Sequence, residues 1–295
     1  MPPASPLPSL TLRSGSGVVT IHLFGAHITS YIFNNQERTW VSSLSDLSGN
    51  NPIRGGVPIA FPQFADSGDL PLHGFARVST WTVGTRTDSS VTLTLDSAAA
   101  PNEWTERNQF TLEYTVSLSE SGDELNLSLA VANTGSNNWS FTGCLHTYFL
   151  FAETSQVELH GLGGAEFTEK CSVERSVKMQ EDAVVVIPAE ARKSGTEAGF
   201  EHGFVDRIYH DTSNEFEFKR GGDVLYTVKQ SPSWPDTTVY NPWLGDKQGT
   251  KGPDFDDDGY TKIICLEPTV SHRSVQEVEA GGTWVGWQSI KCGLF

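Results

Sequence analysis

Apolar and polar side chains alternate with a period of two along most of the chain from residue 10 onward. The alternation is clearest in residues 90–96, 110–118, 125–131, 157–160, 216–219 and 224–229. Because successive side chains of a strand point to opposite faces, this period is typical of half-buried antiparallel β-strands. The pattern therefore predicts a protein made largely of such strands.

Polar turns that contain glycine separate the predicted strands. Examples are residues 120–123, 133–137 and 220–223, where glycine stands with serine, asparagine or aspartate, a composition that favours tight turns. No segment has the period of a long amphipathic helix, although residues 101–108 could form a short helical turn. We therefore predict an all-β fold, a large antiparallel β-sandwich.

The length of 295 residues would suit two average domains, but the pattern favours one. All-β sandwiches of this size form single domains, and no linker-like change of composition interrupts residues 10–295. Residues 1–9 are rich in proline and serine and are predicted to form a flexible N-terminal arm. Residues 189–203 are the most polar stretch and are predicted to form a long surface loop.

The chain is acidic, with 20 lysines and arginines against 36 aspartates and glutamates and a formal net charge of −16. This charge repels nucleic-acid phosphates and anionic membranes, so neither is an expected partner. An anionic substrate must therefore be held by a few local arginines. No secretory signal is visible and no apolar run approaches the roughly 20 residues that span a bilayer. We expect a cytoplasmic protein, whose oligomeric state the sequence does not indicate.

Two titratable residues lie in apolar, strand-like segments. His146 lies within residues 144–149, and Glu267 follows the apolar run at 263–266. A half-buried histidine can donate a proton near neutral pH, and a carboxylate that is desolvated in a cleft becomes a usable base. Each residue also has a purely structural alternative. His146 could be a core histidine bonded to a backbone carbonyl, and Glu267 could be a solvated carboxylate at a strand end.

The four cysteines are Cys144, Cys171, Cys265 and Cys292, and no C-x-x-C pair occurs. This spacing excludes a zinc cluster and a dense disulfide framework.

Cys144 and Cys265 each precede one of the two titratable residues by two positions. Residues i and i+2 of a strand share a face. We therefore expect both thiols beside or beneath one cleft, although small core residues chosen for their volume are an alternative.

Three further clusters add candidate binding residues. Arg54 precedes two glycines, which let a backbone approach a ligand, and its forked guanidinium suits a phosphate or a carboxylate. His73 and Arg77 flank a glycine, and Asp206 stands beside an arginine. Each cluster also has a structural alternative. Arg54 could be a solvated arginine at a tight turn, His73 a structural histidine, and Asp206 part of an ion-paired loop.

Two segments resemble ligand-binding motifs without matching them. Residues 254–259 have the opening of a calcium-binding loop, but its twelfth position, a glutamate in such loops, is Cys265. We predict a solvated acidic loop there. Residues 245–252 are rich in glycine and lysine but do not match a nucleotide phosphate-binding loop.

Five motifs in a fixed order carry a family resemblance. They are HGFAR at 73–77, LHTYF at 145–149, DRIY at 206–209, VYNPW at 239–243 and CLEP at 265–268. Together they resemble the aldose 1-epimerase (galactose mutarotase-like) superfamily. The chain looks most like its hexose-6-phosphate mutarotase branch, which also shares the motif IRGGVPIAFP at 53–62. The resemblance covers roughly residues 10–292.

The resemblance implies a galactose mutarotase-like β-sandwich with a sugar site in a concave face. It implies that His146 is the general acid and Glu267 the general base. It further implies that the 6-phosphate is held by Arg54 and Arg77. No metal or organic cofactor is implied.

The same resemblance implies that Asp206 and His73 hold the sugar hydroxyls or orient the ring. Trp243 would help to exclude water. The expected reaction is the interconversion of the α and β anomers of a hexose 6-phosphate, with glucose 6-phosphate as the first candidate.

Three other functions remain as alternatives. A mutarotase for unphosphorylated aldoses would keep the acid and the base without the phosphate site. A non-catalytic sugar-binding protein would share the fold alone. A glycoside hydrolase would use Asp206 and Glu267 as paired carboxylates.

Overall fold

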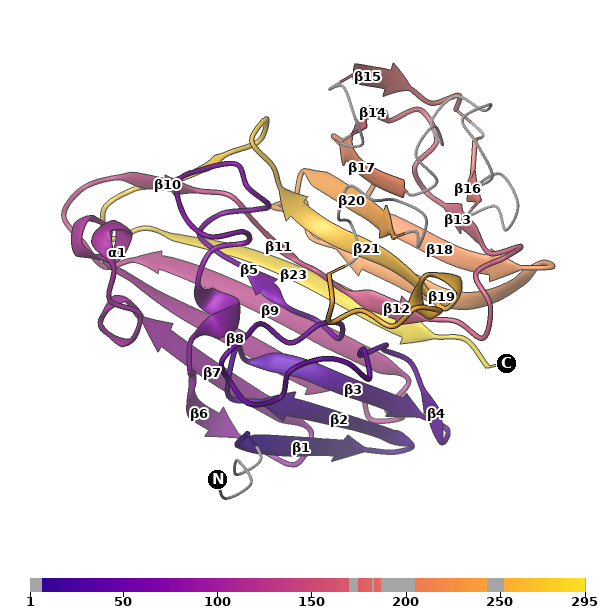
Figure 1. Cartoon of the computed structure of the whole chain (residues 1–295), viewed down its shortest axis with the longest axis horizontal. Coiled ribbons are helices and arrows are strands. Elements are labelled where there is room, and N and C mark those ends of the chain that lie inside the picture. The colour runs from indigo at the N-terminus through magenta and orange to yellow at the C-terminus, as the bar shows by residue number, and fades with distance from the viewer. Residues whose placement is uncertain (1–6, 170–174, 182, 187–204, 243–251, 295) are drawn as a thin grey trace.

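The computed structural model describes residues 7–169, 175–181, 183–186, 205–242 and 252–294. Within these residues, the strands pair antiparallel into two large sheets and two small ones (Figure 1). The predicted all-β antiparallel fold is confirmed.

The larger sheet contains nine strands among the described residues. In spatial order they are β16 (Val185–Val186), β13 (Glu158–His160), β18 (Glu215–Arg220), β19 (Asp223–Gln230), β23 (Thr283–Cys292), β9 (Glu124–Asn133), β8 (Phe110–Leu118), β7 (Ser90–Asp96) and β6 (Thr82–Arg86). The predicted strands at 90–96 and 110–118 coincide with β7 and β8. The other four predicted strands fall on β9, β13, β18 and β19.

The second large sheet carries the predicted site. In spatial order its strands are β15 (Arg175–Lys178), β14 (Glu166–Glu169), β17 (Val205–His210), β20 (Asp236–Asn241), β21 (Ile263–Val270), β11 (Gly143–Leu145) and β5 (Ile59–Ala60), and β12 (Tyr148–Leu150) also pairs with β21. β21 is therefore a central strand with β20 on one side and β11 and β12 on the other.

Two small sheets and a few short helices complete the described fold. A third sheet contains β1 (Ser9–Ser14), β2 (Gly17–His22), β3 (His27–Phe33) and β4 (Gln36–Glu37), and a fourth pairs β10 (Trp139–Phe141) with β22 (Gln276–Val278). The described helices are α1 (Glu103–Arg107) and the single 3₁₀ turns η1 (Ala76–Val78), η2 (Ser97–Ala99) and η4 (Gly259–Thr261). None of them has the length and apolar character that crossing a bilayer requires.

The predicted helical turn forms as α1. The side chain of Asn102 accepts hydrogen bonds from the backbone N–H groups of Trp104 and Thr105, and the Thr105 hydroxyl accepts one from Asn102 N. This reciprocal cap satisfies N–H groups that have no partner within the first turn. A helix this short therefore depends on its cap and on packing for stability.

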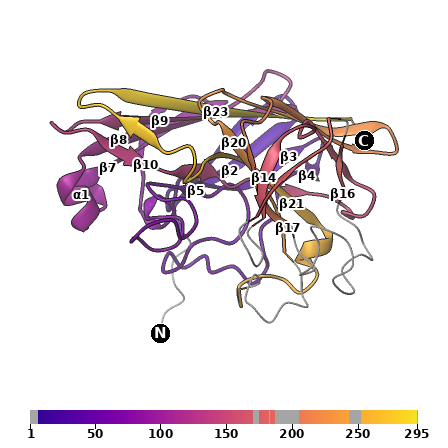
Figure 2. The ribbon, with the colours of Figure 1, turned by 90° about the horizontal axis from the view of Figure 1, so that it is seen from above.

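The two large sheets form the layers of a sandwich. Seen from above, β23, β9 and β8 run along one side of the molecule, and β20, β21 and β17 lie on the other (Figure 2). Alternate residues of β8 and β9 are buried, and they join apolar residues of β1–β3 and β21 in one hydrophobic core. The period of two thus marks one buried face, as the sequence predicted.

Several predicted boundaries fall at or beyond the described residues. Residues 1–6 of the predicted arm and the predicted loop at 189–203 lie outside them. β1 begins at Ser9, within the predicted arm. The single domain over residues 10–295 stays a prediction.

Leu129 offers a test of this packing, because its side chain in β9 is 1% exposed. Replacing Leu129 by Ala removes buried methyl groups and leaves a cavity, which should lower the free energy of unfolding by about 2–5 kcal/mol. The control Ser128→Ala, on the opposite face of the same strand, should change it by about 0.5 kcal/mol or less. Urea unfolding of both variants measures the difference, and equal effects would contradict the assignment of the buried face.

Candidate active site

The register of the second sheet aligns four polar side chains in one row. Asp206 in β17 lies opposite Tyr240 in β20, Tyr240 opposite Cys265 in β21, and Cys265 opposite Tyr148 in β12. Residues that lie opposite one another in neighbouring strands project from the same face of a sheet. The row therefore places Asp206 and Cys265 on one face.

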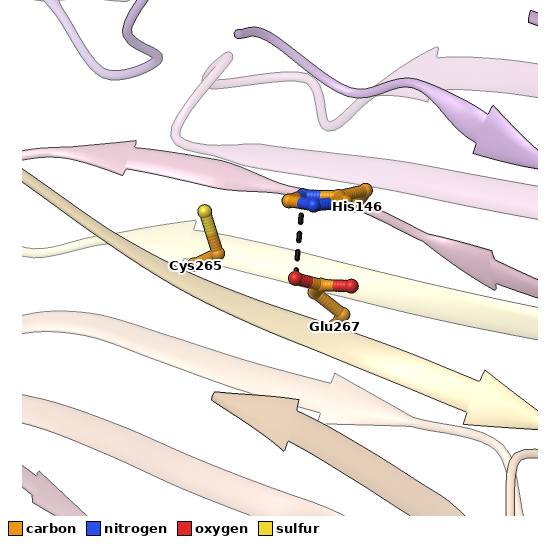
Figure 3. Close-up of side chains that lie close together, drawn as sticks. All are labelled: His146, Cys265 and Glu267. Carbon is orange, nitrogen blue, oxygen red and sulfur yellow. Dashed lines mark ion pairs between the residues drawn. The ribbon is translucent and has the colours of Figure 1, made fainter. Parts of the chain in front are cut away.

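A second row, two residues along the strands, carries the predicted acid and base. Ile208 lies opposite Thr238, and Thr238 lies opposite Glu267. His146 stands next, with its Nδ1 atom 3.3 Å from Glu267 Oε1 (Figure 3). The two residues predicted to transfer protons are thus in direct contact, although they are far apart in the sequence.

Glu267 is a buried carboxylate, and its side chain is 1% exposed. The alternative of a solvated strand end is wrong, because Glu267 lies inside β21, a strand whose residues are all buried. Its Oε2 atom accepts a hydrogen bond from the Cys144 thiol at 3.4 Å. A buried charge must be paired or hydrogen-bonded, and His146 and Cys144 meet that requirement.

Aromatic rings surround the imidazole of His146. It stacks on Tyr148 with the centroids 4.6 Å apart and the planes at 8°, and the edges of His73 and Tyr240 meet it at 5.5 and 6.0 Å. His146 follows the end of β11, and its backbone N–H donates to the carbonyl of Pro58 at 2.9 Å. The ring is held in one orientation, with 12% of the side chain exposed.

The two glycines after Arg54 fit the chain against its neighbours. Gly56 has a φ of 64°, and a Cβ there would lie 2.0 Å from the carbonyl oxygen of Ile28. His27 donates from Nε2 to the carbonyl of Gly55 at 2.7 Å, and burial lowers the pKa of His27 to about 3. Gly56 thus gives room to β3, and Gly55 gives room to the backbone of Trp40 and Val41.

Arg54 and Arg77 bring two positive charges to this region. Arg54 forks onto Asp254, with Nε–Oδ2 at 3.1 Å and Nη2–Oδ1 at 3.2 Å, and Arg77 Nη2 donates to the carbonyl of Leu72 at 2.6 Å. Arg77 Nε is buried and has no hydrogen-bond partner among the described residues. Burial and, after it, repulsion by Arg54 lower the pKa of Arg77. The two guanidinium groups line the same pocket.

Four of the six predicted site residues line one pocket. Its lining comprises Pro52, Ile53, Arg54, Pro58, Ala60, His73, Arg77, His146, Tyr148 and Asp254. The Nδ1 atom of His73 accepts a hydrogen bond from the N–H of Ala65 at 3.2 Å, so Nε2 carries the proton of the neutral ring. Glu267 meets the pocket through its contact with His146. Asp206 is not among the lining residues.

Asp206 lies in a strand, which corrects the alternative of an ion-paired loop. The adjacent Arg207 points to the opposite face, where its Nε atom contacts Glu169 Oε2 at 3.1 Å. Burial and, after it, the charges of Glu267 and Asp206 raise the pKa of the Cys265 thiol. The charge of Asp206 therefore acts on Cys265, which belongs to the same row of polar side chains.

Asp254 is a site residue that the sequence did not reveal. The acidic segment at 254–259 was predicted to be solvated, yet Asp254 pairs with Arg54, and Asp256 accepts hydrogen bonds from the backbone and hydroxyl of Ser43. Arg54 and Asp254 are 200 residues apart, so no local spacing signalled the pair. Tyr148 also lines the pocket, but in the sequence it stood out only as a member of the LHTYF motif.

The described residues also contain one mixed set of metal-ligand atoms. The donor atoms of His146, Cys265 and Glu267 all lie within 4.8 Å of one another. Two predictions concern residues that the structure does not describe. They are the exclusion of water by Trp243 and the glycine-rich segment that contains residues 245–251.

Comparison with known proteins defines the class of this chain. The model of the Aldose 1-epimerase family matches residues 8–291. The chain belongs to this family, and it is an isomerase of the aldose 1-epimerase type.

Two relatives make the likeness more specific. A protein of Cenchrus ciliaris named "Putative glucose-6-phosphate 1-epimerase" is 29% identical over 279 residues, which are 90% of this chain and 78% of that protein. A protein of the same name from Salmonella typhimurium is 25% identical over 265 residues, which are 87% of this chain and 81% of that protein.

Solved structures share the fold. The crystal structure of a mutarotase-like protein from Salmonella typhimurium matches with a TM-score of 0.79 at 22% identity, over 97% of this chain and 90% of that one. A protein of Synechocystis matches with a TM-score of 0.75 at 17% identity, over 98% and 97%. The predicted galactose mutarotase-like sandwich is confirmed.

Both thiols lie close to the carboxylate of Glu267, since Cys144 donates to it and the sulfur of Cys265 lies within 4.8 Å of it. Both residues are fully buried, and burial raises the pKa of Cys265, so little thiolate exists at neutral pH. Iodoacetamide should therefore alkylate them at least about tenfold more slowly in the native protein than in urea. Peptide mass spectrometry measures both rates, and equally fast labelling would contradict the buried placement.

Proposed function

We propose that this protein interconverts the α and β anomers of a hexose 6-phosphate, with glucose 6-phosphate as the first candidate, and that His146 and Glu267 transfer the protons. The observation that carries the proposal is the contact of these two side chains at 3.3 Å, beside a pocket that Arg54 and Arg77 also line. The names of the two relatives support the phosphorylated substrate.

The chemistry needs one proton removed and one supplied at neighbouring oxygens. Glu267 takes the proton of the anomeric hydroxyl while His146 gives one to the ring oxygen, and the C1–O5 bond breaks as the C1–O1 bond becomes a carbonyl. Rotation about the C1–C2 bond and closure in the reverse sense give the other anomer. Protons and electrons balance, so no oxidant or reductant is consumed.

The close placement of the acid and the base suits this reaction. Both reacting oxygens are bonded to the same carbon, so the groups that serve them must also be close together. In the free protein the side chains of His146 and Glu267 lie at ion-pair distance, and a sugar placed at this contact would form hydrogen bonds to both groups in its place. Catalytic hydrogen bonds often reach their final geometry only when substrate is bound.

The arginines favour an anionic group on the sugar. A guanidinium has five N–H donors, and the bonds of Arg77 to Leu72 and of Arg54 to Asp254 leave others for a phosphate. Burial lowers the pKa of Arg54, but the neighbouring Tyr148 and Asp254 raise it overall, so the group stays charged. In a protein of net charge −16 this local pair of cations is what can attract a phosphate.

We propose three further features of this enzyme. Asp206 and His73 hold or orient the sugar, the enzyme acts in the cytoplasm, and it needs no metal or organic cofactor. A mutarotase of unphosphorylated aldoses is the second candidate, since the same acid and base would serve it.

The acid–base roles are tested by His146→Gln and Glu267→Gln. Each should lower kcat by about 10²–10⁴-fold, because each removes one proton transfer. The matched control Glu113→Gln changes an exposed carboxylate of β8 and should leave the rate unchanged. NMR exchange at C1 of glucose 6-phosphate measures the rates, and near-normal turnover in either site variant of confirmed fold would exclude the mechanism.

The phosphate site is tested by Arg77→Ala. A charge-assisted hydrogen bond contributes about 1.5–3 kcal/mol, so KM for glucose 6-phosphate should rise roughly 10–100-fold. KM for free glucose should stay nearly constant, and the surface control Arg13→Ala should change neither value. An equal rise of KM for both sugars would contradict the phosphate site and favour unphosphorylated aldoses as the substrates.

A further inference from the structure

Three donor atoms of different kinds meet at the acid–base pair. They belong to the imidazole of His146, the thiol of Cys265 and the carboxylate of Glu267, and all lie within 4.8 Å of one another. Figure 3 shows the imidazole and the carboxylate facing each other, with the thiol of Cys265 beside them. We propose that these three residues bind a divalent transition-metal ion of the zinc type, and that the bound ion blocks catalysis.

The separations suit a tetrahedral ion. Zinc bonds of about 2.0–2.3 Å to nitrogen, oxygen and sulfur place tetrahedral donors roughly 3.3–3.8 Å apart. The distance from His146 Nδ1 to Glu267 Oε1 is 3.3 Å and already matches. The other separations within the set are at most 4.8 Å, so they exceed the tetrahedral range by at most about 1 Å.

The sheet holds the donors in place before any ion arrives. Cys265 and Glu267 are two residues apart in β21, so their side chains share one face. Stacking on Tyr148 fixes the ring of His146 beside them. A site whose ligands are positioned in advance loses little conformational entropy when it binds.

The donor types select the class of ion. An imidazole, a thiol and a carboxylate form the mixed set that zinc and cobalt accept, whereas calcium and magnesium prefer oxygen donors alone. A thiolate and a carboxylate together neutralise a divalent charge. Three protein donors also leave the fourth position of the ion open for water.

Such an ion would oppose the proposed reaction. Coordination occupies Nδ1 of His146 and the carboxylate of Glu267, which are the groups proposed to exchange protons with the sugar. The ion is therefore an inhibitor and not a cofactor. Inhibition rests on the proposed function, but binding rests only on the positions of the three side chains.

Cobalt(II) is a direct probe of the site, because its spectrum reports both thiolate ligation and tetrahedral geometry. Titration of the full chain, kept reduced, should give a near-ultraviolet thiolate-to-cobalt band and intense visible bands that saturate at one ion per chain. Added zinc should remove both. Absence of the thiolate band in the unsubstituted protein would overturn the proposal.

Cys265→Ser should abolish the thiolate band and weaken cobalt binding at least tenfold. The matched control is Cys144→Ser, since Cys144 also contacts Glu267 but does not belong to the donor set. This control should keep the band. An unchanged band in Cys265→Ser would assign the thiolate to another cysteine and overturn the proposal.

Glu267→Gln provides a second test if Cys265→Ser does not fold. It keeps the shape of the side chain and removes its charge, so the thiolate band should persist while the Kd for cobalt rises at least tenfold. An unchanged Kd would overturn the assignment of Glu267 as a ligand.

Turnover separates this inference from the proposed function. Zinc should inhibit anomerisation of glucose 6-phosphate, and a chelator should restore the rate. Cobalt bound through Cys265 without loss of turnover would confirm the metal site and contradict the acid–base roles of His146 and Glu267. If zinc inhibits turnover but cobalt gives no thiolate band, the proposed metal site is overturned and the proposed function is unaffected.

Discussion

The placement of one carboxylate inside a fully buried strand is the constraint on which the site depends. Glu267 in β21 loses nearly all contact with water, and an isolated charge there would cost several kcal/mol. The imidazole of His146 and the thiol of Cys144 offset that cost. The neighbouring strands must therefore supply polar partners at positions where a sandwich normally places apolar side chains.

The same burial makes the pair chemically useful. A low-dielectric surrounding strengthens each interaction of a charged group, and aromatic rings such as Tyr148 keep the imidazole of His146 in one orientation. Arg54 and Arg77 line the adjoining pocket together with Asp254, which pairs with Arg54. The site thus combines a buried acid–base pair with charged side chains in the adjoining pocket.

Strand positions could be predicted from the sequence because their cause is local. In β7 and β8 each residue faces either the core or the outside, so the alternation shows both the element and its ends. The pairing of Cys265 with Glu267 on one face follows from the same geometry. The contact of His146 with Glu267 could not be predicted in this way, because it depends on the register of β21 against its neighbours.

The sequence by itself determined the strand content, the acidic charge and, through five ordered motifs, the family. It also singled out four of the residues that line the pocket, namely Arg54, His73, Arg77 and His146. Only the tertiary structure decided that Glu267 is buried beside His146 and that Asp254 holds Arg54, a residue 200 positions away. The physical reason is that side-chain direction within a strand is a local property, whereas burial and ion pairing depend on which distant strands and loops pack together.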